Sequence, residues 1–197
     1  MFTGIIESLA QVKEKTETGT NVNFKIEASI TPELKVDQSV AHNGVCLTVT
    51  NIEGNHYWVT AVEETLNKTN LHSLDQGSLV NLERCMKADG RYDGHMVYGH
   101  VDTVGKCIEA KKLDGSYLFT FEFDSENSHL IVEKGSISIN GISLTIFNVT
   151  KNQFTVTIIP YTFEHTNIKE IKEGDLVNLE FDIIGKYINR KLLLSQE

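Results

Sequence analysis

This chain of 197 residues has few cysteines, no long apolar run and no recognisable targeting segment. Its three cysteines, Cys46, Cys85 and Cys107, are odd in number and widely spaced, so they form neither a disulfide framework nor a C-x-x-C metal site. No apolar stretch reaches the length of a membrane span. The first residues lack the charged start and apolar core of a signal peptide. We therefore expect a soluble protein in a reducing cytoplasm.

Basic residues are also scarce. The chain has 18 Lys and Arg against 27 Asp and Glu, a formal net charge of −9, and no basic run. This balance argues against a nucleic-acid-binding surface, because phosphate contacts need clustered Lys and Arg. The composition, 40% hydrophobic and 23% charged, is that of an ordinary globular protein.

What the chain does contain is an internal repeat. Residues 39–83 match residues 136–180 without a gap, and about 18 of the 45 positions are identical. The shared positions include an Asn-Gly-x-(Cys/Ser)-Leu-Thr motif, found at 43–48 and 140–145, and a Val-Asn-Leu-Glu motif, found at 80–83 and 177–180. A repeat of this length indicates duplication of one structural unit.

The repeat predicts two small domains, at residues 1–95 and 96–185. Each half holds about six short segments of alternating polar and apolar residues, broken by Gly and Asn turns, and the first of these segments is expected to run from Phe2 to Val12. The fold class is therefore all-β: two tandem six-stranded antiparallel Greek-key barrels related by internal duplication, since closure removes exposed edges. The tail, 186–197, has no copy in the first half and is rich in helix formers, which predicts a C-terminal α-helix that packs either against its own domain or against another subunit.

Taken alone, most of the polar motifs have a structural explanation. The Asn-Gly pairs are typical of hairpin turns. Cys46 by itself is more often a small buried residue than a nucleophile, and Ser143 at the matching place favours a shared pocket position over a required thiol. His95 and His100, five apart on a strand, would face opposite sides, so no metal is expected. The Val-Asn-Leu-Glu segments are interpreted as barrel strands without chemistry.

In combination, these features resemble the riboflavin synthase family over nearly the whole chain. The resemblance rests on the N-terminal Met-Phe-Thr-Gly-Ile-Ile-Glu, the paired Asn-Gly motifs, Gly94-His95, the segment 99–102 and the two Val-Asn-Leu-Glu segments. It implies a homotrimer with sites between subunits, assembled through the C-terminal helix. It also implies a transferase that converts two molecules of 6,7-dimethyl-8-ribityllumazine into riboflavin and 5-amino-6-ribitylaminopyrimidinedione, with no metal or redox cofactor. Association with lumazine synthase stays open.

The resemblance also assigns residues to two lumazine pockets. Candidates for chemistry are Ser143 as hydroxyl donor or nucleophile, Thr145 beside it, His100 for proton transfer, Cys46 as the counterpart of Ser143, and Asp182 and Ser39 for polar contacts across subunits. The expected substrate-binding residues also include Phe2, Gly4, Ile5, Ile6, Leu47, Thr48, Thr60, Ala61, Val62, Glu63, Glu64, Thr65, Gly99, Val101, Lys134, Leu144, Thr157, Ile158, Ile159, Pro160, Tyr161 and Thr162.

A second function is compatible with the same fold: a non-catalytic lumazine- or flavin-binding antenna protein. An antenna needs one good pocket, whereas dismutation needs two. The second repeat keeps Ser143, Thr145, Lys134 and Thr162, which favours the enzyme. Tyr98 and Tyr161 depart from the common family pattern and could alter the shape of the pockets.

Overall fold

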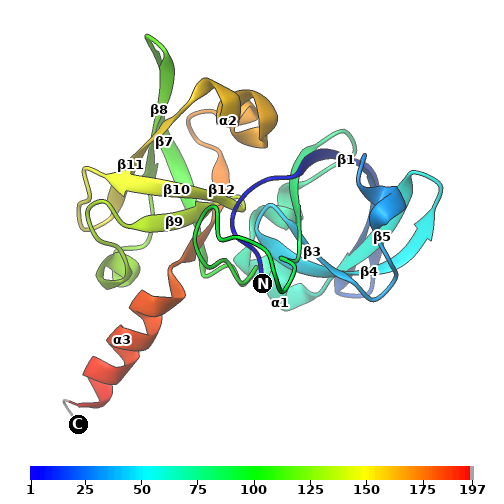
Figure 1. The fold of residues 1–197 in the computed structure, drawn as a ribbon, viewed down its shortest axis with the longest axis horizontal. Helices are drawn as coiled ribbons and strands as arrows, with labels where there is room; N and C mark the ends of the chain where they lie inside the picture. The colour runs from blue at the N-terminus through cyan, green and yellow to red at the C-terminus, as the bar shows by residue number, and fades with distance from the viewer. Residues whose placement is uncertain (196–197) are drawn as a thin grey trace.

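The computed structural model describes residues 1–195 and contains two closed antiparallel barrels that lie side by side (Figure 1). The first barrel has the strand order β1-β2-β5-β4-β3-β6. Its strands are β1 (Ser8–Thr18), β2 (Asn21–Glu27), β3 (Ser39–His42), β4 (Val45–Glu53), β5 (His56–Ala61) and β6 (Leu79–Arg84). Its short helical segments are η1 (Thr31–Glu33), α1 (Glu63–Lys68) and η2 (Asn70–Ser73).

The second barrel repeats this plan with the strand order β10-β11-β8-β7-β12-β9. Its strands are β7 (Thr103–Leu113), β8 (Ser116–Glu122), β9 (Ser136–Ile139), β10 (Ile142–Phe147), β11 (Gln153–Ile158) and β12 (Leu176–Phe181). The helical segments η3 (Ser125–Leu130), α2 (Pro160–His165) and η4 (Asn167–Glu170) complete it. The prediction of two six-stranded barrels is confirmed.

Alternation of side chains explains why these segments form barrels. In β2, Val22, Phe24 and Ile26 are buried while the residues between them are half-exposed. This period of two puts every second side chain inside the barrel. Each barrel has its own apolar core. Strands β2 and β8 contribute side chains to these two cores from corresponding positions of the repeats. Burial of these side chains contributes on the order of 2 kcal/mol each.

The two Asn-Gly pairs form the predicted hairpin turns. Asn43 and Gly44 have φ of 48° and 79°, and Asn140 and Gly141 have φ of 46° and 81°. Two successive positive φ values are required by the two-residue turn that best matches strand twist. The turns also touch each other: a Cβ atom on Gly44 would lie 2.8 Å from the backbone N of Gly141. Glycine is therefore needed at both places for close approach of the barrels.

The first strand begins later than expected. Its predicted start was Phe2, but β1 begins at Ser8, and Phe2 forms only an isolated bridge with Val97. Residues 2–7 instead run between the two barrels, where Gly4 has a φ of 78° that a continuous strand does not allow. Alternation of apolar residues alone did not reveal that this segment pairs with the other repeat.

Six buried asparagines join the barrels. They form three pairs of repeat positions, Asn43 and Asn140, Asn70 and Asn167, and Asn81 and Asn178, all of which are 1–5% exposed. Within the first barrel, the Asn81 backbone N donates to Asn43 Oδ1 at 2.9 Å, and in the second, the Asn178 N donates to Asn140 Oδ1 at 2.8 Å. In each barrel, one hydrogen bond within that barrel therefore joins two of its three asparagines.

Bonds between the barrels use the remaining amide groups. Asn81 Nδ2 donates to the Asn140 carbonyl at 2.9 Å, and Asn178 Nδ2 donates to the Asn43 carbonyl at 2.8 Å. Backbone N–H groups bond across as well: that of Asn70 donates to Asn178 Oδ1 at 2.6 Å and that of Asn167 to Asn81 Oδ1 at 2.7 Å. Because a buried polar group left without a partner is costly, this network fixes the orientation of the two barrels.

Helix α3 (Ile183–Leu194) extends away from the second barrel (Figure 1). It begins three residues before the expected tail segment, because Asp182 Oδ1 caps it by accepting a hydrogen bond from the Ile184 backbone N at 2.9 Å. Residues 196 and 197, included in the predicted tail, lie outside the described residues. No helix in residues 1–195 combines the length and the apolar character needed to cross a membrane.

The asparagine network predicts that Asn81→Ala and Asn178→Ala each destabilise the fold. Each substitution removes a buried side chain whose partners include a backbone N–H and a backbone carbonyl of the other barrel. We expect a loss of about 2–4 kcal/mol in the free energy of unfolding, measured by chemical denaturation. Asn152→Ala is the control, because that side chain makes one bond, to Glu122 at 3.1 Å. Equal effects at all three positions would show that the network does not hold the barrels together.

Candidate functional site

The first group of expected pocket residues lies on the outer side of the first barrel. Cys46 is half-buried and Thr48 is exposed on β4, while Leu47 between them points into the core. Ser39 lies opposite Thr48 on β3. On β5, Val59 pairs with Val49 of β4, and Thr60 follows Val59 directly, so β5 contributes the other edge. Residues 62–65 follow directly and form the start of α1.

The second barrel repeats this arrangement. Ser143 is half-buried and Thr145 is exposed on β10, and Ser136 lies opposite Thr145 on β9. Thr157 is exposed near the end of β11, and residues 159–162 lead into α2. The structure thus brings most of the expected residues together in two matching groups. Ala61 and Ile158, like Leu47, belong to the barrel cores and support these groups from inside.

Two buried glutamates hold the segments that cross between the barrels. Glu83 accepts hydrogen bonds from the Thr3 backbone N at 2.6 Å and the Gly4 N at 2.9 Å. Glu180 accepts from the Tyr98 N at 2.6 Å and from the Gly99 and His100 N atoms at 2.9 Å. Burial raises the pKa of both carboxyl groups, and these backbone donors oppose that increase. Each glutamate therefore positions the loop that crosses to the other barrel.

Each crossing segment ends against the pocket strand of the opposite barrel. The Ser143 backbone N donates to the Gly4 carbonyl at 2.8 Å, and the Cys46 N donates to the Gly99 carbonyl at 2.9 Å. A Cβ atom on Gly4 would lie 2.6 Å from the Ser143 Cβ, and one on Gly99 would lie 2.6 Å from the Cys46 Cβ. Gly4 and Gly99 are therefore required for this close approach, and each candidate pocket is built from both repeats.

His95 lies beside Ser143. The His95 Nδ1 and Ser143 Oγ atoms are 2.7 Å apart, a hydrogen-bond distance. Burial lowers the pKa of His95 below its usual value of 6.5, and the charge of Asp182 partly opposes this decrease. The imidazole is consequently neutral at pH 7 and able to accept a proton from the serine hydroxyl. Ser143 and His95 thus form a hydrogen-bonded polar pair, and the Asp182 carboxylate acts on the imidazole through its charge.

The first barrel has different chemistry at the corresponding place. Cys46 replaces Ser143, and Cys85 replaces Asp182. The Met1 amino group is 3.8 Å from the Cys85 Sγ atom. Burial raises the pKa of Cys46, although a hydrogen bond from Ser39 opposes this effect, so the thiol is protonated at pH 7. The serine–histidine contact of the second copy thus corresponds to a protonated thiol in the first.

Of the other expected residues, His100 and Lys134 are exposed, whereas Phe2 is buried. The His100 side chain is exposed, and its ring centroid is 6.1 Å from that of Tyr98. Lys134 is exposed and has its Nζ 5.0 Å from the centroid of the Phe147 ring. Phe2 is completely buried between the barrels, where it packs with Ala41 and Val97. Phe2 therefore supports the crossing segments from behind rather than presenting its ring to the surface.

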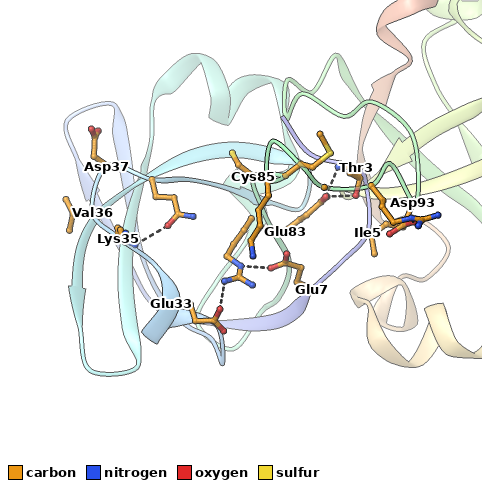
Figure 2. A pocket seen from close by; sticks show the side chains of 16 residues that line it. Thr3, Ile5, Glu7, Glu33, Lys35, Val36, Asp37, Glu83, Cys85 and Asp93 are labelled. Atoms are coloured by element: carbon orange, nitrogen blue, oxygen red, sulfur yellow. Dashed lines mark hydrogen bonds and ion pairs between the residues drawn. The ribbon is translucent and has the colours of Figure 1, made fainter.

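A pocket of about 810 Å³ opens on the first barrel beside the crossing segment (Figure 2). Thr3, Ile5 and Glu83 belong to its lining, which connects it to the candidate site. At its centre, Arg84 pairs with Glu7 and Glu33, both at 2.7 Å. These two carboxylates neutralise the guanidinium group, so it is held as part of the wall. In residues 1–195, no three His, Cys, Asp or Glu side chains are grouped so that they could hold a metal.

Sequence reasoning missed His95, Glu83 and Glu180. The sequence points to His95 as half of a metal pair and as part of the Gly94-His95 segment of the resemblance, but its contact with Ser143 depends on a chain path that local patterns do not encode. The two glutamates were assigned to ordinary strands. A signal for them was present, because Asn and Glu recur at the same places of both repeats in strands that are buried on both sides.

Comparison with known proteins agrees with this geometry. The lumazine binding domain model matches the chain twice, at residues 3–85 and 98–182. Riboflavin synthase from Bacillus amyloliquefaciens is 39% identical over 198 aligned residues, which cover 100% of this chain and 92% of that protein. Riboflavin synthase from Schizosaccharomyces pombe is 42% identical over 194 residues, covering 96% of this chain and 93% of the relative.

Solved structures show the same fold. The crystal structure of LumP complexed with 6,7-dimethyl-8-(1'-D-ribityl) lumazine matches with a TM-score of 0.84 and 20% identity, over 92% of this chain and 99% of that one. At this identity the likeness establishes the double-barrel architecture. The sequence relatives go further: the chain belongs to the riboflavin synthase family and contains two copies of the lumazine binding domain.

Proposed function

We propose that this protein is a riboflavin synthase, a transferase that passes a four-carbon unit between two molecules of 6,7-dimethyl-8-ribityllumazine. The products are riboflavin and 5-amino-6-ribitylaminopyrimidinedione. Together they contain all the atoms of the two substrate molecules, so the reaction needs no external oxidant or reductant. The observation that carries this proposal is the pair of matching residue groups around Cys46 and Ser143.

Two similar pockets suit a reaction in which donor and acceptor start as the same molecule. Holding two rings in contact removes much of the entropic barrier of a bimolecular step. The hydroxyls of Thr48 and Thr145, both on exposed residues, can provide equivalent polar contacts in the two pockets, whereas Thr60 is half-buried and its hydroxyl donates to Asn23 Oδ1 at 2.6 Å. Backbone amides of the crossing segments can stabilise negative charge that develops on a bound ring.

The difference between the pockets assigns them different roles. In our proposal, His95 accepts the Ser143 hydroxyl proton through Nδ1 while Oγ adds to the electrophilic ring carbon of one lumazine. The molecule in the Cys46 pocket loses a proton to solvent from the methyl group on its own electrophilic carbon and acts as the nucleophile, and the Oγ–carbon bond later breaks as His95 returns the proton to Ser143. Asp182 stabilises the imidazolium that forms on His95.

We further propose that the active form is a homotrimer, in which the Cys46 pocket of one subunit faces the Ser143 pocket of another. Support comes from α3, which leaves Tyr187, Ile188 and Leu192 between 56% and 73% exposed. An apolar helix surface of this kind is typical of a protein interface. We also propose that the boundary between the two domains lies between residues 95 and 96. The proposed location is the cytoplasm, where the three free cysteines stay reduced.

The direct test is to mix the purified protein with 6,7-dimethyl-8-ribityllumazine and record riboflavin fluorescence. We expect riboflavin to form without added metal, flavin or nicotinamide, and one pyrimidinedione to appear for each riboflavin. Tight binding of the lumazine without turnover would reject the synthase and select the antenna protein. Calorimetry on the same sample distinguishes that outcome from an inactive, non-binding preparation.

Ser143→Ala and His95→Gln should each lower kcat by roughly a hundredfold or more, while KM changes little, because both groups act on the proton that moves. His100→Gln is the matched control and should retain near wild-type kcat. The double variant should be no slower than the worse single variant if the two residues act as one unit. A larger loss from His100→Gln than from His95→Gln would transfer the proton-accepting role to His100.

The same pair predicts the pH dependence of turnover. The pKa of His95 lies below 6.5, so the imidazole stays neutral from alkaline pH down to that lowered value and is protonated only below it. Turnover in the wild type should therefore fall on the acid side of pH 6.5, and this fall should vanish in His95→Gln. An unchanged acid limb in the variant would exclude His95 as its source.

Removal of residues 187–197 should weaken subunit association. This truncation keeps Lys186, whose Nζ is 2.6 Å from Asp102 and which ties the start of α3 to the barrel. We expect light scattering to give a mass near that of one chain for the truncated protein and of three chains for the full one. The same mass for both proteins would reject α3 as the assembly element.

A further inference from the structure

The second barrel has a basic pocket of about 500 Å³ outside the candidate active site. It lies between the β7–β8 hairpin and the segment that follows α2, and four lysines line it: Lys111, Lys112, Lys169 and Lys172. None of the residues expected to bind lumazine belongs to its lining. The pocket is therefore a separate feature of the molecule, and its interpretation does not depend on the proposed function.

An aromatic pair forms part of the apolar lining of the pocket. The Tyr117 and Phe163 rings are stacked, with centroids 3.6 Å apart and planes inclined by 3°. Both side chains are half-buried and pack against the core of the second barrel. Lys112 Nζ is 5.9 Å from the Tyr117 ring centroid. A rigid aromatic pair beside lysine side chains is suited to a planar ring that bears an anionic group, because the ring can stack on the aromatic side chains while the lysines contact the anion.

The lysines of this pocket are available to a ligand. Among residues 1–195, none of the four takes part in an ion pair, and Lys169 Nζ donates only to the Glu164 carbonyl, at 3.0 Å. Glu173 is the single carboxylate in the lining. The local excess of positive charge is unusual in a chain whose net charge is −9.

The first barrel provides an internal comparison, because its corresponding surface has different residues. Glu17, Asp75 and His72 stand where the second barrel has Lys112, Lys172 and Lys169. Val22 and Leu66 replace the aromatic pair, and the hollow they line is about 250 Å³. The barrel fold alone therefore does not require the lysines or the stacked rings.

From the lysines, the aromatic pair and the contrast with the first barrel, we propose that this pocket binds a phosphorylated planar heterocycle. In this arrangement, the lysines contact the phosphate and the aromatic side chains contact the ring. A nucleotide and a phosphorylated flavin share this chemistry, and the two can be distinguished by titration. Lysine is a common phosphate ligand because its ammonium group is a compact positive charge with three donors.

The test is calorimetric titration of the full-length protein with ADP and, separately, with flavin mononucleotide. The decisive variant is Lys112→Glu/Lys172→Asp, which installs the residues of the first barrel. We expect at least one of the two ligands to bind the wild type at one such site per chain, with affinity at least tenfold weaker in the variant. Riboflavin, which lacks the phosphate, should bind both proteins equally, and riboflavin formation should be unchanged. The ligand whose affinity falls identifies which heterocycle the pocket takes.

The matched control is Lys35→Glu/Lys87→Asp, which changes the net charge by the same amount at exposed positions on the first-barrel side. This control should leave the affinity within about twofold of wild type, because distant surface charges are screened by salt. Equal weakening by both double variants would reduce the effect to net charge and overturn the proposal. Failure of both ligands to bind at millimolar concentration would also overturn it.

Two further measurements examine recognition of the ring. Tyr117→Val/Phe163→Leu should weaken ligand binding without affecting inorganic phosphate, and circular dichroism should show that the barrel remains folded. If inorganic phosphate alone bound as tightly as the phosphorylated heterocycle, the pocket would be only an anion patch and the proposal would fail. Affinity that increased steadily with the length of an oligonucleotide would indicate a polynucleotide surface and would equally reject it.

Discussion

Hydrogen bonding between the asparagines of the two repeats is the constraint on which the rest of the structure depends. Each barrel presents three buried amide side chains, and these bond to the backbone and side chains of the other barrel's copies. Among the buried side-chain atoms of residues 1–195, only Asn70 Oδ1 and Asn140 Nδ2 lack a partner. An apolar interface of this size could slide or rotate, whereas directional bonds with short distances specify one arrangement. The relative position of the barrels is thus fixed by polar groups.

That fixed arrangement determines where the pockets lie. Because the barrels cannot rotate, the two crossing segments reach equivalent places on the opposite barrels. The segment held by Glu83 lies beside Ser143, and the segment held by Glu180 lies beside Cys46. The same geometry carries His95, which follows the first repeat in sequence, to the serine of the second. The contact between His95 and Ser143, which come from distant parts of the chain, therefore depends on the asparagine contacts.

Much of the fold was predictable, because local sequence patterns indicate the strands and turns and both repeats carry the same patterns. Alternation gave the strands, Asn-Gly gave the turns, and the repeat gave the number of barrels, together with the positions of Ser143 and Cys46 as equivalents. Contacts between the repeats were not predictable in this way. Phe2 is apolar at an alternating position, and nothing local distinguishes a residue that continues β1 from one that crosses to Val97. Asn81 and Glu83 look like exposed strand residues, but asparagines of the other barrel contact Asn81 and the N-terminal crossing segment contacts Glu83, and both are below 5% exposed.

Duplication also explains which residues stay alike and which diverge. A change at Asn81 or Glu83 would disturb the other barrel as well as its own, so the buried contacts constrain both copies together. The side chains at the pocket positions are less constrained: Ser143 can differ from Cys46, because the contacts that join the repeats there are made by the backbone N–H of each residue. Since the two molecules in a dismutation must end in different chemical states, identical pockets would give neither molecule a preferred role. A symmetric frame with unequal surface groups satisfies both requirements: the polar contacts preserve the geometry, and in the proposed mechanism the pocket residues assign the roles of donor and acceptor.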